Sequence, residues 1–164
     1  MVETERLELV PAPLEMVEAV AAGRRGAVAF PAVIPAEWPG PDLRDFLPTY
    51  ARILAEDPEG ACWGVWVMIE KASRTVIGDI GFKGAPDEHG RVEIGYGVLP
   101  AWRRQGFAVE AASGLVRWAL ADPDVRAIDA ECLADNAPSA RVLEKIGMRC
   151  LGRQGEMLKW KLTR

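Results

Sequence analysis

The sequence predicts an α/β fold of the α+β kind, in which helices flank a mixed central sheet. Three observations predict it. Some short segments alternate between apolar and polar residues, others repeat apolar residues at helical spacing, and the two kinds of segment are interleaved along the chain. The expected order is strand, helices, three strands, helix, strand, helix and two strands.

The first third of the chain predicts a strand, a helix and a shaped loop. Residues 4–10 alternate in polarity, and residues 14–21 place apolar residues at helical spacing. Five prolines surround Trp38 between residues 31 and 48, and they disfavour a long regular element there. A shorter helix is predicted over residues 49–56.

The rest of the chain predicts most of the sheet and two more helices. Strands are expected at residues 63–69, 75–83, 91–98 and 127–133, with two short ones near residues 148 and 158. Residues 108–120 have one apolar face and predict a helix. Asn136 is expected to cap a last helix that runs to Ile146.

Length and composition predict a single domain over residues 1–164, because 49% hydrophobic residues in a chain of 164 can bury one core. Three cysteines without a C-x-x-C pair favour neither a disulfide framework nor a metal site, and they fit a reducing cytoplasm. No segment approaches the roughly 20 apolar residues of a membrane span. A net charge of −4 argues against nucleic acid as a partner.

The segment Arg103–Ala108 joins a predicted strand to a predicted helix. Helix N-termini carry unpaired N–H groups and a partial positive charge, so a glycine turn that leads into a helix can bind an anion. Gly106 allows close approach of the backbone, and Arg103 and Arg104 add positive charge. The short spacing favours a pyrophosphate, although an ordinary helix start explains the same glycine turn.

This segment resembles the R/Q-x-x-G-x-G/A signature of the GCN5-related N-acetyltransferase (GNAT) family, with Arg103, Gly106 and Ala108 at the defining positions. Residues 5–7 and 136–148 resemble the branch that contains the ribosomal-protein N-terminal acetyltransferases. The resemblance covers nearly the whole chain. It implies a GNAT-like central sheet that is mixed and mostly antiparallel, with a splayed strand pair at the cofactor site.

The resemblance also implies acetyl-CoA as co-substrate, with its pyrophosphate held by the N–H groups of residues 105–109. Asn136 and Ser139 would contact the pantetheine arm, although Asn136 also suits a helix cap. The residues expected to contact the cofactor are Val98, Arg103, Arg104, Gln105, Gly106, Phe107, Ala108, Val109, Asn136 and Ser139.

The implied reaction is direct attack of a primary amine on the thioester, for which a general base is useful. Glu93 on the strand of residues 91–98 is the candidate base, and a solvated strand residue is the competing interpretation. Asp79 and Glu131, on adjacent predicted strands, are the reserves.

The leaving thiolate needs a proton, and many relatives supply it from a tyrosine where this chain has Leu143. Ser139, Tyr96 or water are the remaining candidates for this general acid. Ser139 serves equally well as a packing residue of the last helix.

The acceptor is the least determined part of the predicted function. Branch resemblance favours a protein or peptide N-terminus, while a polyamine, an amino acid or an aminoglycoside-like amine is the alternative. A coenzyme A-binding regulatory module without turnover is the rival from another class. Trp38 is expected to line the acceptor site, unless it only anchors its loop, and an open sheet edge also allows a homodimer.

Overall fold

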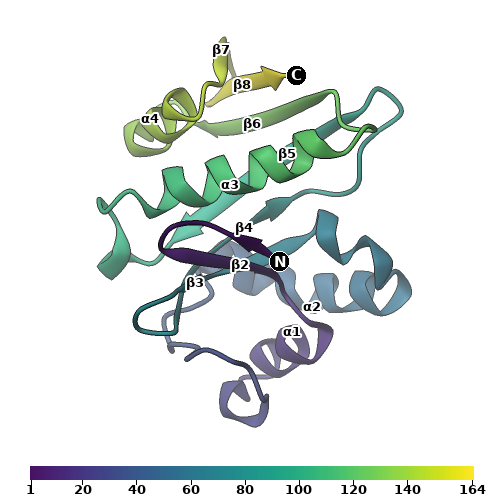
Figure 1. Ribbon diagram of the computed structural model, residues 1–164, viewed down its shortest axis with the longest axis vertical. Coiled ribbons are helices and arrows are strands. Elements are labelled where there is room, and N and C mark those ends of the chain that lie inside the picture. Colours follow the sequence, from purple (N-terminus) through teal and green to yellow (C-terminus); the bar gives the residue numbers. More distant parts are fainter.

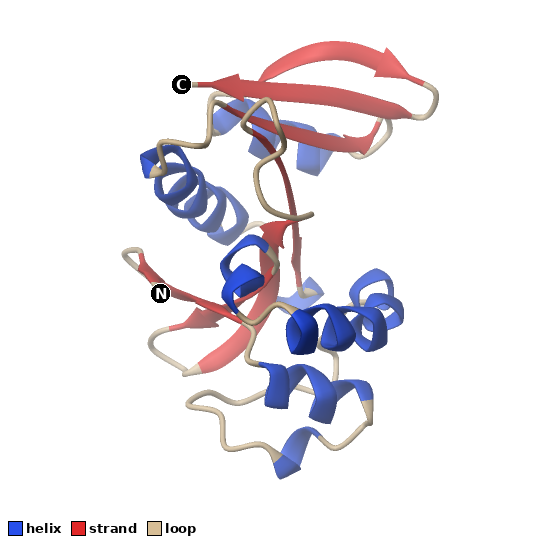
Figure 2. Ribbon diagram, turned by 90° about the vertical axis from the view of Figure 1, so that its right-hand side faces the viewer, coloured by secondary structure: helices blue, strands red, loops and turns tan.

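The computed structural model describes all residues from 1 to 164 as one eight-stranded sheet with helices on both sides (Figures 1 and 2). The strand order is β1-β2-β3-β4-β5-β6-β8-β7. Every neighbouring pair is antiparallel except β5 and β6, which run parallel. The predicted fold class, a mixed and mostly antiparallel sheet, is therefore confirmed.

The elements follow the chain in the predicted order. The strands are β1 Val2–Glu3, β2 Leu7–Pro11, β3 Val65–Glu70, β4 Thr75–Phe82, β5 Arg91–Val98, β6 Ala127–Leu133, β7 Arg149–Gln154 and β8 Met157–Thr163. The helices are α1 Leu14–Ala21, α2 Pro41–Glu56, α3 Phe107–Ala121 and α4 Ala137–Lys145. None of them combines the length and the hydrophobicity that crossing a membrane requires.

Two groups of buried residues cover the two faces of the sheet. On β3, Trp66 and Met68 join the group that contains α3, whereas Val67 and Ile69 join the group that contains α1 and α2. This division follows from the alternation of side chains along a strand. In Figure 1, α3 crosses in front of the sheet, and α1 and α2 gather at the end away from β7 and β8.

The proline-rich segment differs from the prediction, because α2 begins at Pro41 and continues through Pro48. A proline in the first turn costs nothing, since the N–H groups there have no helical partner. Pro48 removes the bond to the carbonyl of Arg44, but both residues are exposed and water can reach that carbonyl. The buried face of Leu47, Tyr50 and Leu54 then stabilises the helix.

Two strand predictions were also too long at their first residues. The segment predicted as one strand from residue 4 begins with a turn at Thr4–Arg6 and continues as β2, which pairs with an additional short strand, β1, in a hairpin. Trp63, the expected start of β3, belongs to the short 3-10 helix Glu59–Trp63. The β5 and β6 strands, in contrast, have the predicted bounds.

The parallel pair β5 and β6 opens partway along its length. Their pairing ends at Ile94 opposite Ala130. Beyond that point β5 continues to Val98 beside β4, and β6 continues to Leu133 beside β8. The two strands therefore diverge, as the resemblance implies, and the split points toward the turn before α3.

Candidate active site

The N-terminus of α3 has the geometry of an anion site. Gly106 caps the helix in the left-handed region, with φ 83° and ψ 0°, which favours glycine. The first bond to the cap runs from the N–H of Glu110 to the carbonyl of Gly106, at 3.0 Å. The N–H groups of Phe107, Ala108 and Val109 therefore have no backbone partner and lie at the positive end of the helix dipole.

The turn that precedes α3 is tied to the end of β5. Arg103 donates from Nε to the carbonyl of Val98 at 2.9 Å, and Gln105 donates from Nε2 to the carbonyl of Ala101 at 3.2 Å. Arg104 adopts a positive φ of 61° and its side chain is exposed. The predicted anion site and the end of the split strand are therefore parts of one local structure.

Arg6, in the turn between β1 and β2, is a third cation at this site. Its Nη1 donates to the carbonyl of Gln105 at 2.9 Å, and its guanidinium lies 4.2 Å from the ring centroid of Phe107. Its Nε donates to Glu110 at 2.7 Å. A Cβ added to Gly106 would lie 3.4 Å from Arg6 Nη2. Arg6 thus fixes both the turn and the first helical turn of α3.

Sequence reasoning assigned no role to Arg6 or Glu110. The backbone N–H of Arg6 donates to Glu110 across a separation of 104 residues, at 2.7 Å, and the Thr4 hydroxyl donates to the same carboxylate at 2.6 Å. Burial raises the pKa of Glu110, but these hydrogen bonds outweigh it and hold the pKa below its usual range. Only the fold brings these residues together.

The backbone of β5 presents polar groups to the split. Lys83 donates from its backbone N–H to the carbonyl of Glu93 at 3.0 Å, so Glu93 turns its backbone toward β4. Because backbone groups alternate along a strand, Tyr96 and Val98 turn theirs toward β6, which has diverged. The Val98 carbonyl accepts a hydrogen bond from Arg103. The backbone N–H groups of Tyr96 and Val98 are therefore the donors that face the split.

Tyr96 and Ser139 meet where the split opens. The Tyr96 hydroxyl lies 2.9 Å from Ser139 Oγ, and Asn136 caps α4 by accepting from the backbone N–H of Ser139 at 3.2 Å. Burial raises the pKa of Tyr96 more than the bond with Ser139 lowers it. Leu143 is only 1% exposed, in the core. Two of the three candidate acids therefore form one pair, and the predicted cap at Asn136 is confirmed.

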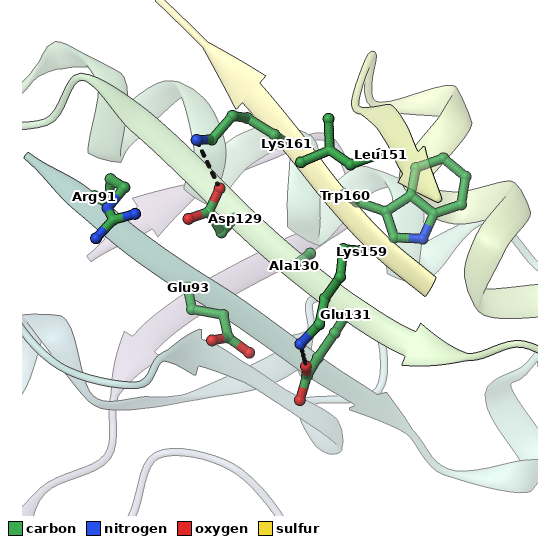
Figure 3. Close-up of a pocket in the computed structure, with 9 residues that line it drawn as sticks. All are labelled: Arg91, Glu93, Asp129, Ala130, Glu131, Leu151, Lys159, Trp160 and Lys161. Atoms are coloured by element: carbon green, nitrogen blue, oxygen red, sulfur yellow. Dashed lines mark hydrogen bonds and ion pairs between the residues drawn. The ribbon is translucent and has the colours of Figure 1, made fainter. Parts of the chain in front are cut away.

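Two of the three candidate bases, Glu93 and Glu131, lie in a charged groove on the face of the sheet opposite α3 (Figure 3). Glu93 forms an ion pair with Lys83, in the part of β5 that is still paired with β6. Glu131 forms an ion pair with Lys159, and this bond holds the pKa of Glu131 below its usual range. A lysine therefore neutralises each of these carboxylates.

Asp79 differs from both, because none of the ion pairs includes it. It lies on β4 opposite Gly97 and accepts a hydrogen bond from Trp38 Nε1 at 3.0 Å. Burial raises the pKa of Asp79 to about 6, against the opposing effect of that hydrogen bond. The Trp38 side chain itself is fully buried, which fits a loop anchor and not a pocket wall.

The unpaired N–H groups at the start of α3 lie beside the split between β5 and β6, an arrangement that suits a long ligand with phosphate at one end. No group of three or more His, Cys, Asp or Glu residues is arranged to hold a metal ion. The sequence pattern of the acetyltransferase (GNAT) domain matches residues 6–149. The chain belongs to the GNAT family, and it is an acetyl-CoA-dependent N-acetyltransferase, as the resemblance implied.

Individual relatives agree with this assignment. YjdG of Bacillus subtilis (strain 168), described as an uncharacterized N-acetyltransferase, is 36% identical over 124 residues, which cover 76% of this chain and 74% of YjdG. Ribosomal-protein-S5-alanine acetyltransferase from Vibrio fischeri shares the fold with a TM-score of 0.68 at 15% identity, over 98% of this chain and 94% of that one. The microcin C7 self-immunity acetyltransferase MccE, in complex with acetyl-CoA and AMP, has a TM-score of 0.69 at 13% identity, over 98% and 93%.

Proposed function

We propose that this N-acetyltransferase acetylates the α-amine of a protein or peptide N-terminus, by direct attack of the amine on acetyl-CoA. The observation that carries the proposal is the open groove of Figure 3, which presents charged side chains of both signs from β5, β6 and β8. An extended peptide can lie along such a strip and meet partners for its own charges. A small polyamine would be better served by unpaired carboxylates, but all three carboxylates that line the groove have lysine partners.

We propose that the cofactor follows the path from the helix N-terminus to the split. The free N–H groups at the start of α3 support a pyrophosphate there, with Arg103 and Arg104 beside it. The pantetheine arm would then run past Asn136 and Ser139, and the thioester carbonyl would meet the N–H of Val98. The resemblance seen in the sequence implied the same cofactor-binding residues.

Chemistry supports an α-amine as acceptor. The amine must be neutral when it attacks, and an α-amine with a pKa near ~8 loses its proton more easily than a lysine near ~10.4. Backbone N–H donors in the split would stabilise the negative charge that develops on the thioester oxygen. The enzyme therefore needs only a base for the amine and a proton for the leaving thiolate.

The acceptor class can be tested with a panel of amines. We expect thiol release from acetyl-CoA with peptides that have a free N-terminus, and a product mass raised by one acetyl group. The matched control is the same peptide with a blocked N-terminus but a free lysine, which should stay unmodified. Faster turnover of spermidine, amino acids or an aminoglycoside than of every peptide would reject a peptide acceptor.

The Tyr96–Ser139 pair is the proposed proton donor to the thiolate. Tyr96→Phe should lower kcat about 10-fold or more, because general acids typically contribute 10²–10⁴-fold and water can substitute in part. Ser139→Ala should also lower kcat. The double variant should lower kcat little further, because the two hydroxyls act as one hydrogen-bonded unit. Steady-state kinetics with coenzyme A affinity measured separately checks this.

The control for this pair is the other tyrosine. The Tyr50 hydroxyl accepts from the backbone N–H of Val65 at 2.9 Å, within the buried group of α1 and α2, so Tyr50→Phe should keep kcat. Normal turnover of both Tyr96→Phe and Ser139→Ala would leave water as the acid.

Two further expectations remain proposals. Three free cysteines, of which Cys150 is exposed, fit the reducing cytoplasm. All residues of the edge strand β7 are exposed, so a second copy of the chain has an unpaired strand against which to form a homodimer.

A further inference from the structure

Asp79 faces the strand position at which the thioester is proposed to lie. It is paired across the sheet with Gly97, and a Cβ added to Gly97 would lie 3.7 Å from Asp79 Oδ1. Gly97 lies between Tyr96 and Val98, whose backbone groups face the split. The carboxylate is therefore next to the reacting end of the cofactor site, on the face of the sheet that carries the groove.

An open strip connects this carboxylate with the groove. Along β5, the residues on this face are Arg91, Glu93, Gly95 and Gly97, because alternate residues of a strand share a face, and the two glycines have no side chain. A Cβ added to Gly95 would have no heavy atom within 4 Å. An amine can therefore pass from the groove to Asp79 with no side chain of β5 between them.

The surroundings of Asp79 hold one oxygen and leave the other free. Trp38 Nε1 donates to Oδ2, and the Trp38 carbonyl accepts from Arg25 Nε at 3.2 Å. The residue opposite on β3 is Val67, and β5 offers only glycine. Tyr50 is the titratable residue of the buried face of α2. Asp79 itself is partly exposed, so Oδ1 can meet an ammonium group.

The acid strength of Asp79 suits this position. Burial raises its pKa to about 6, so the carboxylate is ionised at neutral pH and still accepts a proton more readily than an ordinary aspartate. Glu93 and Glu131 lie further along the groove, each in an ion pair with a lysine. Of the three acids, only Asp79 is free to pair with a cationic substrate.

We propose that Asp79 is the catalytic base, and that Trp38 positions it. The inference rests on the proposed direct attack of an acceptor amine on acetyl-CoA. An acceptor ammonium donates one proton to Asp79, and its freed lone pair forms the C–N bond with the thioester carbon. The C–S bond breaks with its electron pair on sulfur, the Tyr96–Ser139 pair protonates the thiolate and takes up the second amine proton in exchange, and Asp79 returns its proton to water.

The test is the pH dependence of kcat with an acceptor found in the amine panel. The wild type should lose kcat as the pH falls through about 6, where Asp79 becomes protonated. Asp79→Asn should lower kcat about 10²-fold or more, the usual contribution of a general base, and should lose this acidic limb. Coenzyme A affinity, measured by calorimetry, should stay the same, which separates chemistry from binding.

Trp38→Phe supplies a readout that a purely structural role would not move. It keeps an aromatic ring in the core but removes the hydrogen bond that lowers the pKa of Asp79, so the acidic limb should move to higher pH. Glu70→Gln is the matched control, because Glu70 is a carboxylate on neighbouring β3 whose bonds are to Ser73 and Ala72. Glu70→Gln should leave both kcat and the acidic limb of the pH profile unchanged.

The outcomes separate the two proposals. An Asp79→Asn enzyme with wild-type kcat and an unchanged limb overturns the role of Asp79 and leaves N-acetyl transfer intact. Loss of the limb in Glu93→Gln, with Asp79→Asn retaining it, assigns the base to Glu93 instead. A wild-type protein that acetylates no amine overturns both proposals.

Discussion

Replacing Gly106 with valine is expected to weaken coenzyme A binding at least about 100-fold. Gly106 has φ 83°, where a residue with a side chain costs roughly 1–2 kcal/mol and a β-branched one more. The new Cβ would also lie 3.4 Å from Arg6 Nη2, on the side where the pyrophosphate is proposed to approach. Titration calorimetry with coenzyme A measures the change in Kd.

Gly155→Val is the matched control for backbone strain. Gly155 has a similar φ of 62° in the turn between β7 and β8, and a Cβ there has no heavy atom within 4 Å. Both variants should melt at a somewhat lower temperature, but only Gly106→Val should lose affinity. If Gly106→Val binds coenzyme A within about threefold of the wild type, the proposed pyrophosphate site is elsewhere.

Asp79→Asn is expected to stabilise the fold at pH 7.5 while it removes activity. The folded-state pKa of Asp79, about 6, lies above its ordinary value of 3.8, so the folded protein holds this proton more tightly than the unfolded chain. The wild type therefore loses stability as the pH rises from about 4 through about 6, and the loss remains above that. Two pKa units correspond to at most about 3 kcal/mol, and partial exposure of the carboxylate reduces it to about 1–3.

Thermal unfolding at several pH values checks this expectation. Asparagine keeps an oxygen for the Trp38 N–H, so the variant should melt about 2–10 °C higher at pH 7.5 and converge with the wild type near pH 4. Glu70→Gln should do the opposite at neutral pH, because hydrogen bonds from Ser73 hold the pKa of Glu70 below its usual range. An Asp79→Asn protein that melts below the wild type at pH 7.5 would contradict the expected cost of the buried charge.

Much of the fold follows from local patterns in the sequence. The bounds of β5 and β6 and the cap of α4 at Asn136 agree with the prediction because alternation and capping are properties of neighbouring residues. The glycine of the cofactor turn is visible for the same reason. Its place between a strand and a helix is what led to the proposed cofactor site.

Local patterns fail where packing outweighs them. Pro48 predicts a break, but its missing hydrogen bond faces water while Leu47, Tyr50 and Leu54 are buried beside it. Burial of these side chains stabilises α2 by more than the proline costs, and this balance depends on the rest of the fold.

The candidate site depended most on contacts that no local pattern predicts. Glu93 was the first choice of base because of its strand, but Lys83, the residue directly after β4, forms an ion pair with it. Trp38 and Asp79 are 41 positions apart, and their hydrogen bond forms only when the loop before α2 packs on β4. A single sequence shows which acids exist, whereas the fold shows which of them lack a partner.

Arg6 links the start of the chain to the proposed cofactor site. It lies in the first hairpin, yet it bonds to the turn and to α3 about a hundred positions later. Under the proposed binding mode, docking of this hairpin and binding of the cofactor are thermodynamically linked, and linkage is reciprocal. A bound cofactor should hold the hairpin against the sheet, and a change that loosens the hairpin should weaken the cofactor's hold without altering any residue that touches it.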